Sequence, residues 1–70
     1  MSESIYRVTE VIGTSPVSWE EAAKNAVETA ARSLRDLRVG EVVKLDMTID
    51  DGKVAQYRAR VNISFKYEAD

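Results

Sequence analysis

The sequence predicts a small α+β protein of the order β-α-β-β, with a three-stranded antiparallel sheet and one amphipathic helix across one face of it. Three observations predict this fold. Residues 5–12 are rich in β-branched and aromatic residues, residues 19–37 repeat apolar residues at spacings of three and four, and the last thirty residues contain two alternating segments around an Asp-Gly turn. These segments fill the chain without a linker or a repeat, so we expect one domain over residues 1–70.

The first expected strand, residues 5–12, places Tyr6, Val8 and Ile12 on one face, with Glu10 among them. The Gly-Thr-Ser-Pro segment at 13–16 should end this strand. Its glycine and hydroxyl residues favour a connection that needs turn geometry. Backbone N–H groups between a strand and a helix can also hold an anion, which is the alternative interpretation of this segment.

The helix is expected to begin with a capping box at Ser18 and Glu21, in which each side chain accepts the backbone N–H of the other residue. It should run for about five turns and end near Leu37. Trp19 in its first turn is expected to close one end of the core, and a stacking platform is the alternative. The expected packing face consists of Trp19, Ala23, Ala26, Val27, Ala30, Leu34 and Leu37.

Residues 39–49 alternate as a strand, Asp50-Asp51-Gly52 predicts a hairpin turn, and residues 53–66 alternate as the last strand. In the last strand, one face should be apolar and the other polar. The apolar face comprises Tyr57, Ala59, Val61, Ile63 and Phe65, and the polar row comprises Gln56, Arg58, Arg60, Asn62 and Ser64.

Glu41 is the unusual residue of the middle strand. Strict alternation places it in an otherwise apolar row with Val39, Val43, Leu45 and Met47. An ionised carboxylate on a buried face needs a charge-assisted partner, and Arg58 or Arg60 of the polar row would supply it. The polar row would then line a cavity or a subunit interface. The alternatives are that Glu41 reaches solvent at a sheet edge and that the polar row is a solvated face.

Alternation also places Asp46 on the face opposite Glu41. Together with Asp50, Asp51 or copies of itself, Asp46 would offer oxygen ligands to a hard cation such as calcium. We therefore take Asp46 as the candidate metal ligand.

Composition excludes several classes of function. The net charge is −2, from ten basic and twelve acidic residues, which argues against a nucleic-acid partner. The apolar runs are too short for a membrane span or an export signal, so we expect a cytoplasmic protein without a membrane partner. The chain has no His and no Cys, which excludes disulfides, the usual structural zinc sites and common catalytic sets. We therefore expect that the protein is not an enzyme.

A core of this size is marginal by itself, and with disulfides and zinc excluded, oligomerisation is the remaining source of stability. The other face of the three-stranded sheet must meet water or another subunit. Self-association is therefore expected.

Several segments together resemble the dodecin family over nearly the whole chain. They are Val-Ile-Gly-Thr-Ser at 11–15, Ser-Trp-Glu-Glu-Ala at 18–22, Glu-Val at 41–42, the Asp-Gly turn, and the spacing of Tyr57, Val61 and Phe65. The resemblance implies a sheet that partly wraps the helix, and a hollow homo-dodecamer. It also implies flavin binding, as a store or buffer rather than as a catalyst.

Two positions depart from the flavin-binding dodecins. Val39 stands where those proteins carry a Trp that stacks on the flavin, and Arg58 stands where they carry a Gln that bonds the flavin's polar edge. Comparable stacking contributes roughly 1–3 kcal/mol per ring. Ser-Trp-Glu at 18–20, Arg-Val at 38–39, Asp-Met at 46–47 and Tyr-Arg at 57–58 resemble instead a calcium-binding branch.

The expected function is therefore a non-enzymatic, self-assembling protein that binds or stores a small ligand or a divalent cation, with calcium as the candidate. Binding and buffering of flavin, as riboflavin or FMN, is the alternative, and a purely structural assembly is the second alternative. The residues expected to face the ligand or an interface are Val39, Glu41, Gln56 and Arg58.

Overall fold

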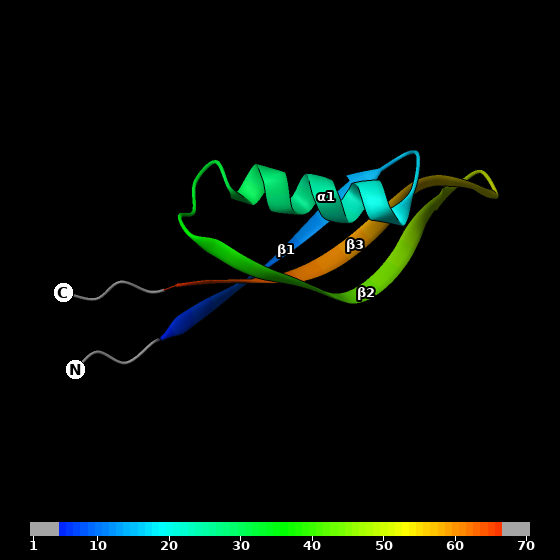
Figure 1. Ribbon diagram of the computed structural model, residues 1–70. Coiled ribbons are helices and arrows are strands. Elements are labelled where there is room, and N and C mark those ends of the chain that lie inside the picture. Colours follow the sequence, from blue (N-terminus) through cyan, green and yellow to red (C-terminus); the bar gives the residue numbers. More distant parts are fainter. Residues whose placement is uncertain (1–4, 67–70) are drawn as a thin grey trace, which may run out of the picture.

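The computed structural model describes residues 5–66 and confirms the α+β prediction. Its elements are β1 (Tyr6–Ser15), α1 (Trp19–Ala30), β2 (Leu37–Asp50) and β3 (Lys53–Lys66). The sheet order is β1-β3-β2, and both neighbouring pairs are antiparallel. The helix lies across one face of the sheet, and the β2–β3 hairpin extends beyond the first turn of the helix (Figure 1). In the described residues no helix has the length and apolar character needed to cross a membrane.

β1 continues further than the sequence predicts. It remains paired with β3 through Gly13, opposite Ala59, and through Ser15, opposite Tyr57. Gly13 is buried, and a Cβ atom at that position would overlap the carbonyl oxygen of Ala22. The glycine therefore does not break the strand: it lets the helix approach the strand backbone.

Half of the expected capping box is confirmed. The Ser18 Oγ accepts the backbone N–H of Glu21 at 3.0 Å. The other half is wrong, because Glu21 Oε1 accepts instead from the Ser15 hydroxyl at 2.7 Å. Ser15 is 1% exposed, and its Oγ also accepts the N–H groups of Val17 at 2.9 Å and Ser18 at 3.4 Å. These bonds support the turn interpretation of this segment, since they use its N–H groups internally.

The helix ends at Ala30, not near Leu37 as predicted. The chain then tightens into turns, in which the N–H of Arg32 donates to Thr29 O and that of Ser33 to Ala30 O, both at 3.1 Å. Asp36 adopts a φ of 58°, which reverses the chain before β2 begins. Pairing of β2 with β3 thus overrides the helical periodicity of this segment.

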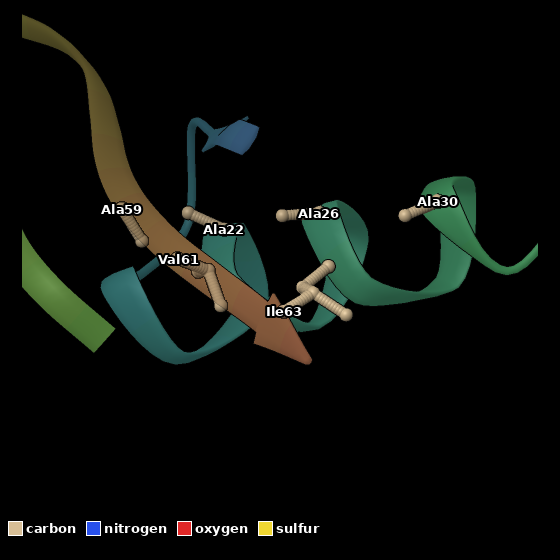
Figure 2. Close-up of a cluster of buried hydrophobic side chains, with 6 residues drawn as sticks. All are labelled: Ala22, Ala26, Ala30, Ala59, Val61 and Ile63. Carbon is tan, nitrogen blue, oxygen red and sulfur yellow. The ribbon is translucent and has the colours of Figure 1, made fainter. Parts of the chain in front are cut away.

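The core lies between α1 and β3. Ala22, Ala26 and Ala30 of the helix face Ala59, Val61 and Ile63 of the strand, and all six are at most 8% exposed (Figure 2). The predicted apolar face of β3 is confirmed at its three central positions. The helix is rotated slightly from the prediction, since Ala22 is fully buried whereas Ala23 only packs beside the core.

β2 contains an irregularity that the alternating pattern does not reveal. Val42 pairs with Val61 and Lys44 pairs with Arg60, so Val43 is an extra residue between them. Such a bulge reverses the alternation of every residue beyond it. The predicted shared face of Val39 with Leu45 and Met47, and with Glu41 among them, is therefore wrong.

The hairpin turn is confirmed. Asp51 and Gly52 have φ values of 53° and 75°, and the pair Asp50–Lys53 closes the strands around them. Two consecutive positive φ values are typical of the type I′ turn that Asp-Gly favours. The turn thus sets the start of the β2–β3 register.

Candidate functional site

The sheet has one face beneath the helix and one face turned away from it, here called the outer face. Residues directly opposite each other on antiparallel strands share a face, and Ala59, Val61 and Ile63 are buried beneath α1. The polar row of β3 therefore lies on the outer face, as predicted. Its partners on that face are Val8, Glu10, Ile12 and Thr14 of β1, and Val39, Glu41, Lys44, Asp46 and Thr48 of β2.

All five predicted site residues lie on the outer face. Val39 and Glu41 precede the bulge in β2 and Asp46 follows it, while Gln56 and Arg58 belong to β3. The bulge brings Asp46 to the same face as Glu41, which corrects the expectation that they lie on opposite faces.

Within residues 5–66, Glu41 forms no ion pair with an arginine. It stands opposite Asn62, is exposed, and lies on an edge strand of the sheet. The predicted pair of Glu41 with Arg58 is wrong at the level of one subunit, since Arg58 binds Asp46. The alternative, an acid at a sheet edge that reaches solvent, describes Glu41 in the isolated subunit.

Asp46 and Arg58 form a two-pronged ion pair across the β2–β3 ladder. Arg58 Nε donates to Asp46 Oδ1 at 2.7 Å, and a terminal guanidinium nitrogen donates to Oδ2 at 2.8 Å. These bonds lower the pKa of Asp46 below its ordinary value, and the carboxylate raises the pKa of Arg58. The two side chains are 38% and 37% exposed, so solvent screens the pair.

Trp19 ties the start of the helix to the same place on β2. Its Nε1–H donates to the Asp46 carbonyl oxygen at 2.9 Å, and its ring meets that of Tyr57 edge-on at a centroid distance of 5.0 Å. The sequence predicted that Trp19 closes one end of the core, but Trp19 is not among the side chains packed against the core, and its contacts lie with Asp46 and Tyr57 instead. Its bond to Asp46 links residues 27 positions apart, and no spacing rule would have found it.

Asp46, the predicted metal ligand, is already bound to Arg58. Both of its carboxylate oxygens accept from Arg58, so a cation at Asp46 would compete with the guanidinium. Within residues 5–66, no group of three or more His, Cys, Asp or Glu residues is placed to hold a metal ion.

Two hollows border the helix. A groove of about 450 Å³ lies between α1 and β1, and Asn25 Nδ2 donates to Thr14 O at 3.1 Å beside it. Among the described residues, those that line this groove are all uncharged. A smaller apolar hollow of about 120 Å³ lies between α1 and β2, where Val39 and Gly40 form part of the wall.

The helix leaves one strip of β2 uncovered. Val42, Leu45 and Met47 lie on the helix side of the sheet, yet they are 48%, 49% and 39% exposed. Figure 1 shows the reason, since α1 crosses above β1 and β3 while β2 curves away from it. We call these three residues the β2 apolar strip. A contiguous apolar patch of this kind marks an interaction surface.

Comparisons with known proteins agree with this geometry. The family model described as Dodecin matches residues 5–68. The calcium dodecin of Mycobacterium tuberculosis is 46% identical over 63 residues, which cover 90% of this chain and 89% of that protein. The dodecin of Thermus thermophilus is 31% identical over 64 residues, covering 91% and 93% of the two chains.

Solved structures give the same result. The dodecin from Streptomyces coelicolor superposes with a TM-score of 0.92 at 41% identity, and the match covers 100% of each chain. The crystal structure of the Mycobacterium tuberculosis calcium dodecin, described as calcium chelating with a novel calcium-binding site, superposes with a TM-score of 0.82 at 46% identity. That match covers 96% of each chain.

Proposed function

Because the chain belongs to the dodecin family, we propose that it is a non-enzymatic protein that assembles with copies of itself and holds a small ligand or a divalent cation. The expected assembly is a hollow homo-dodecamer in the cytoplasm. The observation that carries the proposal is the β2 apolar strip, which the protomer leaves exposed on the side of the sheet where it builds its own core.

Self-assembly is favoured by the free energy that burial of the β2 apolar strip would contribute. Fully burying a Val, Leu or Met side chain contributes about 1.5–3 kcal/mol, and the three strip residues are each between 39% and 49% exposed. The buried core of one chain is small and consists largely of alanine. Burial of the strip against another copy therefore adds apolar contact that the protomer lacks.

The ligand is proposed to bind at the outer face once copies have assembled. Val39, Glu41, Gln56 and Arg58 are its proposed contacts, and all four project from that face. A hard cation such as calcium takes six to eight oxygen ligands, more than one copy of this face provides at one point. The calcium dodecin of Mycobacterium tuberculosis supports a cation as the candidate. Asp46 would contribute only by exchanging Arg58 for the cation.

Flavin binding is the second candidate. It is weakened by two features of the outer face: Val39 offers no ring for stacking, and both prongs of Arg58 are already bound to Asp46. A titration with riboflavin and with FMN, followed by flavin fluorescence, separates the candidates. We expect no strong quenching. Quenching at a fixed stoichiometry per subunit would instead support the flavin function.

The main experiment measures native mass and bound metal together. We expect a dodecamer that carries calcium after dialysis against the ion and loses it to a chelator. A stable monomer at micromolar concentration would contradict the assembly. A dodecamer that retains neither calcium nor flavin would support the third possibility, a purely structural assembly.

A further inference from the structure

The outer face of the sheet carries a row of residues with two positive charges and no acid. The register places Ile12 of β1, Arg60 of β3 and Lys44 of β2 directly opposite one another. Like charges that stand directly opposite each other on neighbouring strands destabilise the strand pair. Glu10 and Glu41 lie one row further along the strands, and among the described residues neither acid forms an ion pair with this row. The described part of the subunit therefore leaves both cationic groups of the row without an acid partner.

The acid on the other side of the row is already neutralised. Asp46 accepts from Arg58 with both carboxylate oxygens. The hydrogen bonds from Arg58 are the main cause of the lowered pKa of Asp46, and the charges of Lys44 and Arg60 lower it further. These three basic side chains therefore lie close enough to act on the same carboxylate. With one acid among them, they leave a net charge of +2 on this part of the outer face.

We propose that Lys44 and Arg60 together bind a phosphate group of a small anionic ligand at the outer face. This inference rests on the ligand binding proposed above for that face, and it names the class of the ligand. A phosphate accepts charge-assisted hydrogen bonds at several oxygens, so one group can bind the ammonium and the guanidinium at once. Its charge of about −1.5 to −2 replaces the repulsion between the two side chains by an attraction to each of them.

A phosphate in this row is compatible with a divalent cation on the same face. Small divalent cations are commonly held by one or two carboxylates together with phosphate oxygens rather than by protein ligands alone. Glu41, one row away, would provide the carboxylate, and the bound phosphate would provide oxygens that one copy of the face lacks. A cation placed directly at Asp46 would instead meet the three basic side chains around it.

Titration with inorganic phosphate tests this site. Calorimetry at constant ionic strength and with a chelator present keeps changes in screening and bound cations out of the measurement. We expect the wild type to bind phosphate and to gain thermal stability from it. In Lys44→Gln and in Arg60→Gln, which each remove one of the two donors, binding should be at least about tenfold weaker. Without phosphate, Lys44→Gln should be as stable as the wild type or more stable, because the repulsive pair is gone.

Lys24→Gln, on the exposed side of α1, removes the same charge and is the matched control. It should keep the phosphate affinity of the wild type. AMP and adenosine identify the source of the phosphate, and adenosine should not bind. Tighter binding of AMP than of inorganic phosphate indicates a phosphate ester as the ligand, whereas equal binding indicates the free ion.

Three results would overturn this inference: no phosphate binding, equal weakening by Lys44→Gln and Lys24→Gln, or adenosine binding as tight as that of AMP. The proposed assembly and calcium binding are measured without phosphate, so they would stand. A monomer that binds phosphate but no calcium would overturn the assembly and the cation, and it would leave the phosphate site in place.

Discussion

The two strands of the β2–β3 hairpin carry apolar residues on the same side of the sheet, but those of β3 are buried whereas those of β2 are exposed. Val61 of β3 is 1% exposed, while Val42 directly opposite it on β2 is 48% exposed. Ala59 is fully buried, and its partner Leu45 is 49% exposed. The difference is the position of α1, which packs on β1 and β3 and reaches β2 mainly through Trp19.

The part of the sheet that α1 covers and the exposed strand β2 therefore differ in what their residues stabilise. The covered half has the close-packed alanines and the glycine that let one short helix seal a core. The uncovered strand keeps apolar side chains that the protomer cannot bury. Changes in the covered half should therefore alter the stability of the fold, and changes in the β2 apolar strip should alter association.

Gly13→Val should have the largest effect, because it breaks the covered half. The new side chain would start from a Cβ atom that overlaps the Ala22 carbonyl oxygen and lies 2.8 Å from Ala26 Cβ, so helix and strand must separate. We expect a loss of at least about 3 kcal/mol in the free energy of unfolding, measured by denaturant at fixed protein concentration.

Gly40→Ala is the matched control for that change. A Cβ atom at Gly40 would meet Val27 at 3.4 Å and Val61 at 3.5 Å, close to ordinary contact distances. We expect stability within about 1 kcal/mol of the wild type. Equal losses in both variants would show that close approach of the helix is not what Gly13 provides.

Leu45→Gln tests the uncovered strand. The side chain is half exposed in the subunit, so the fold should tolerate the change, whereas association should lose the burial of an apolar side chain. Burial of the remaining half of the side chain contributes about 0.7–1.5 kcal/mol, which corresponds to about three- to twelvefold weaker association in sedimentation or native mass measurements. A fully assembled variant would remove the strip from the interface.

Trp19→Phe tests the link between the two halves. It removes the Nε1–H bond to the Asp46 carbonyl oxygen but keeps a ring beside Tyr57. We expect a loss of about 1 kcal/mol in the free energy of unfolding. In hydrogen exchange, β2 should lose protection near Asp46 more than β1 does, and uniform loss would contradict the tether.

Asp46→Asn should have the smallest effect and gives a pH signature. Because Arg58 lowers the pKa of folded Asp46, the pair stabilises the fold above the unfolded pKa of about 4, and this contribution is lost as the pH falls through the folded pKa. Exposure keeps the effect small. The variant should be slightly less stable at pH 7 and should lose less stability than the wild type on acidification below pH 4. Asp50→Asn, at the hairpin end, is the control and should keep the wild-type pH profile.

Sequence reasoning succeeded where a local rule acts. The Asp-Gly turn, the Ser18 cap and the alternation of β3 each depend on a few neighbouring residues, and the structure confirms all three. It failed where distant strands compete with local pattern. Pairing of Leu37 with Phe65 draws that residue into β2 and ends the helix at Ala30.

The candidate site shows the same division. The residue types of the outer face and the polar row of β3 follow from the sequence. The partner of Arg58 does not, because the hairpin turn and one extra residue of β3 at Ala55 set the register that places Asp46 opposite it. An extra residue shifts the pairing of two strands by one position and leaves no signal in the composition. Alternation therefore indicated Glu41, whereas the observed register places Asp46 opposite Arg58.

The sequence by itself determined the β-α-β-β order, the hairpin, the family resemblance and the lack of His and Cys, since these depend on local spacing and on residue identity. Only the tertiary structure decided which faces are covered. A helix of 12 residues spans two strands of a three-stranded sheet, and the apolar residues of the third remain for another surface to bury.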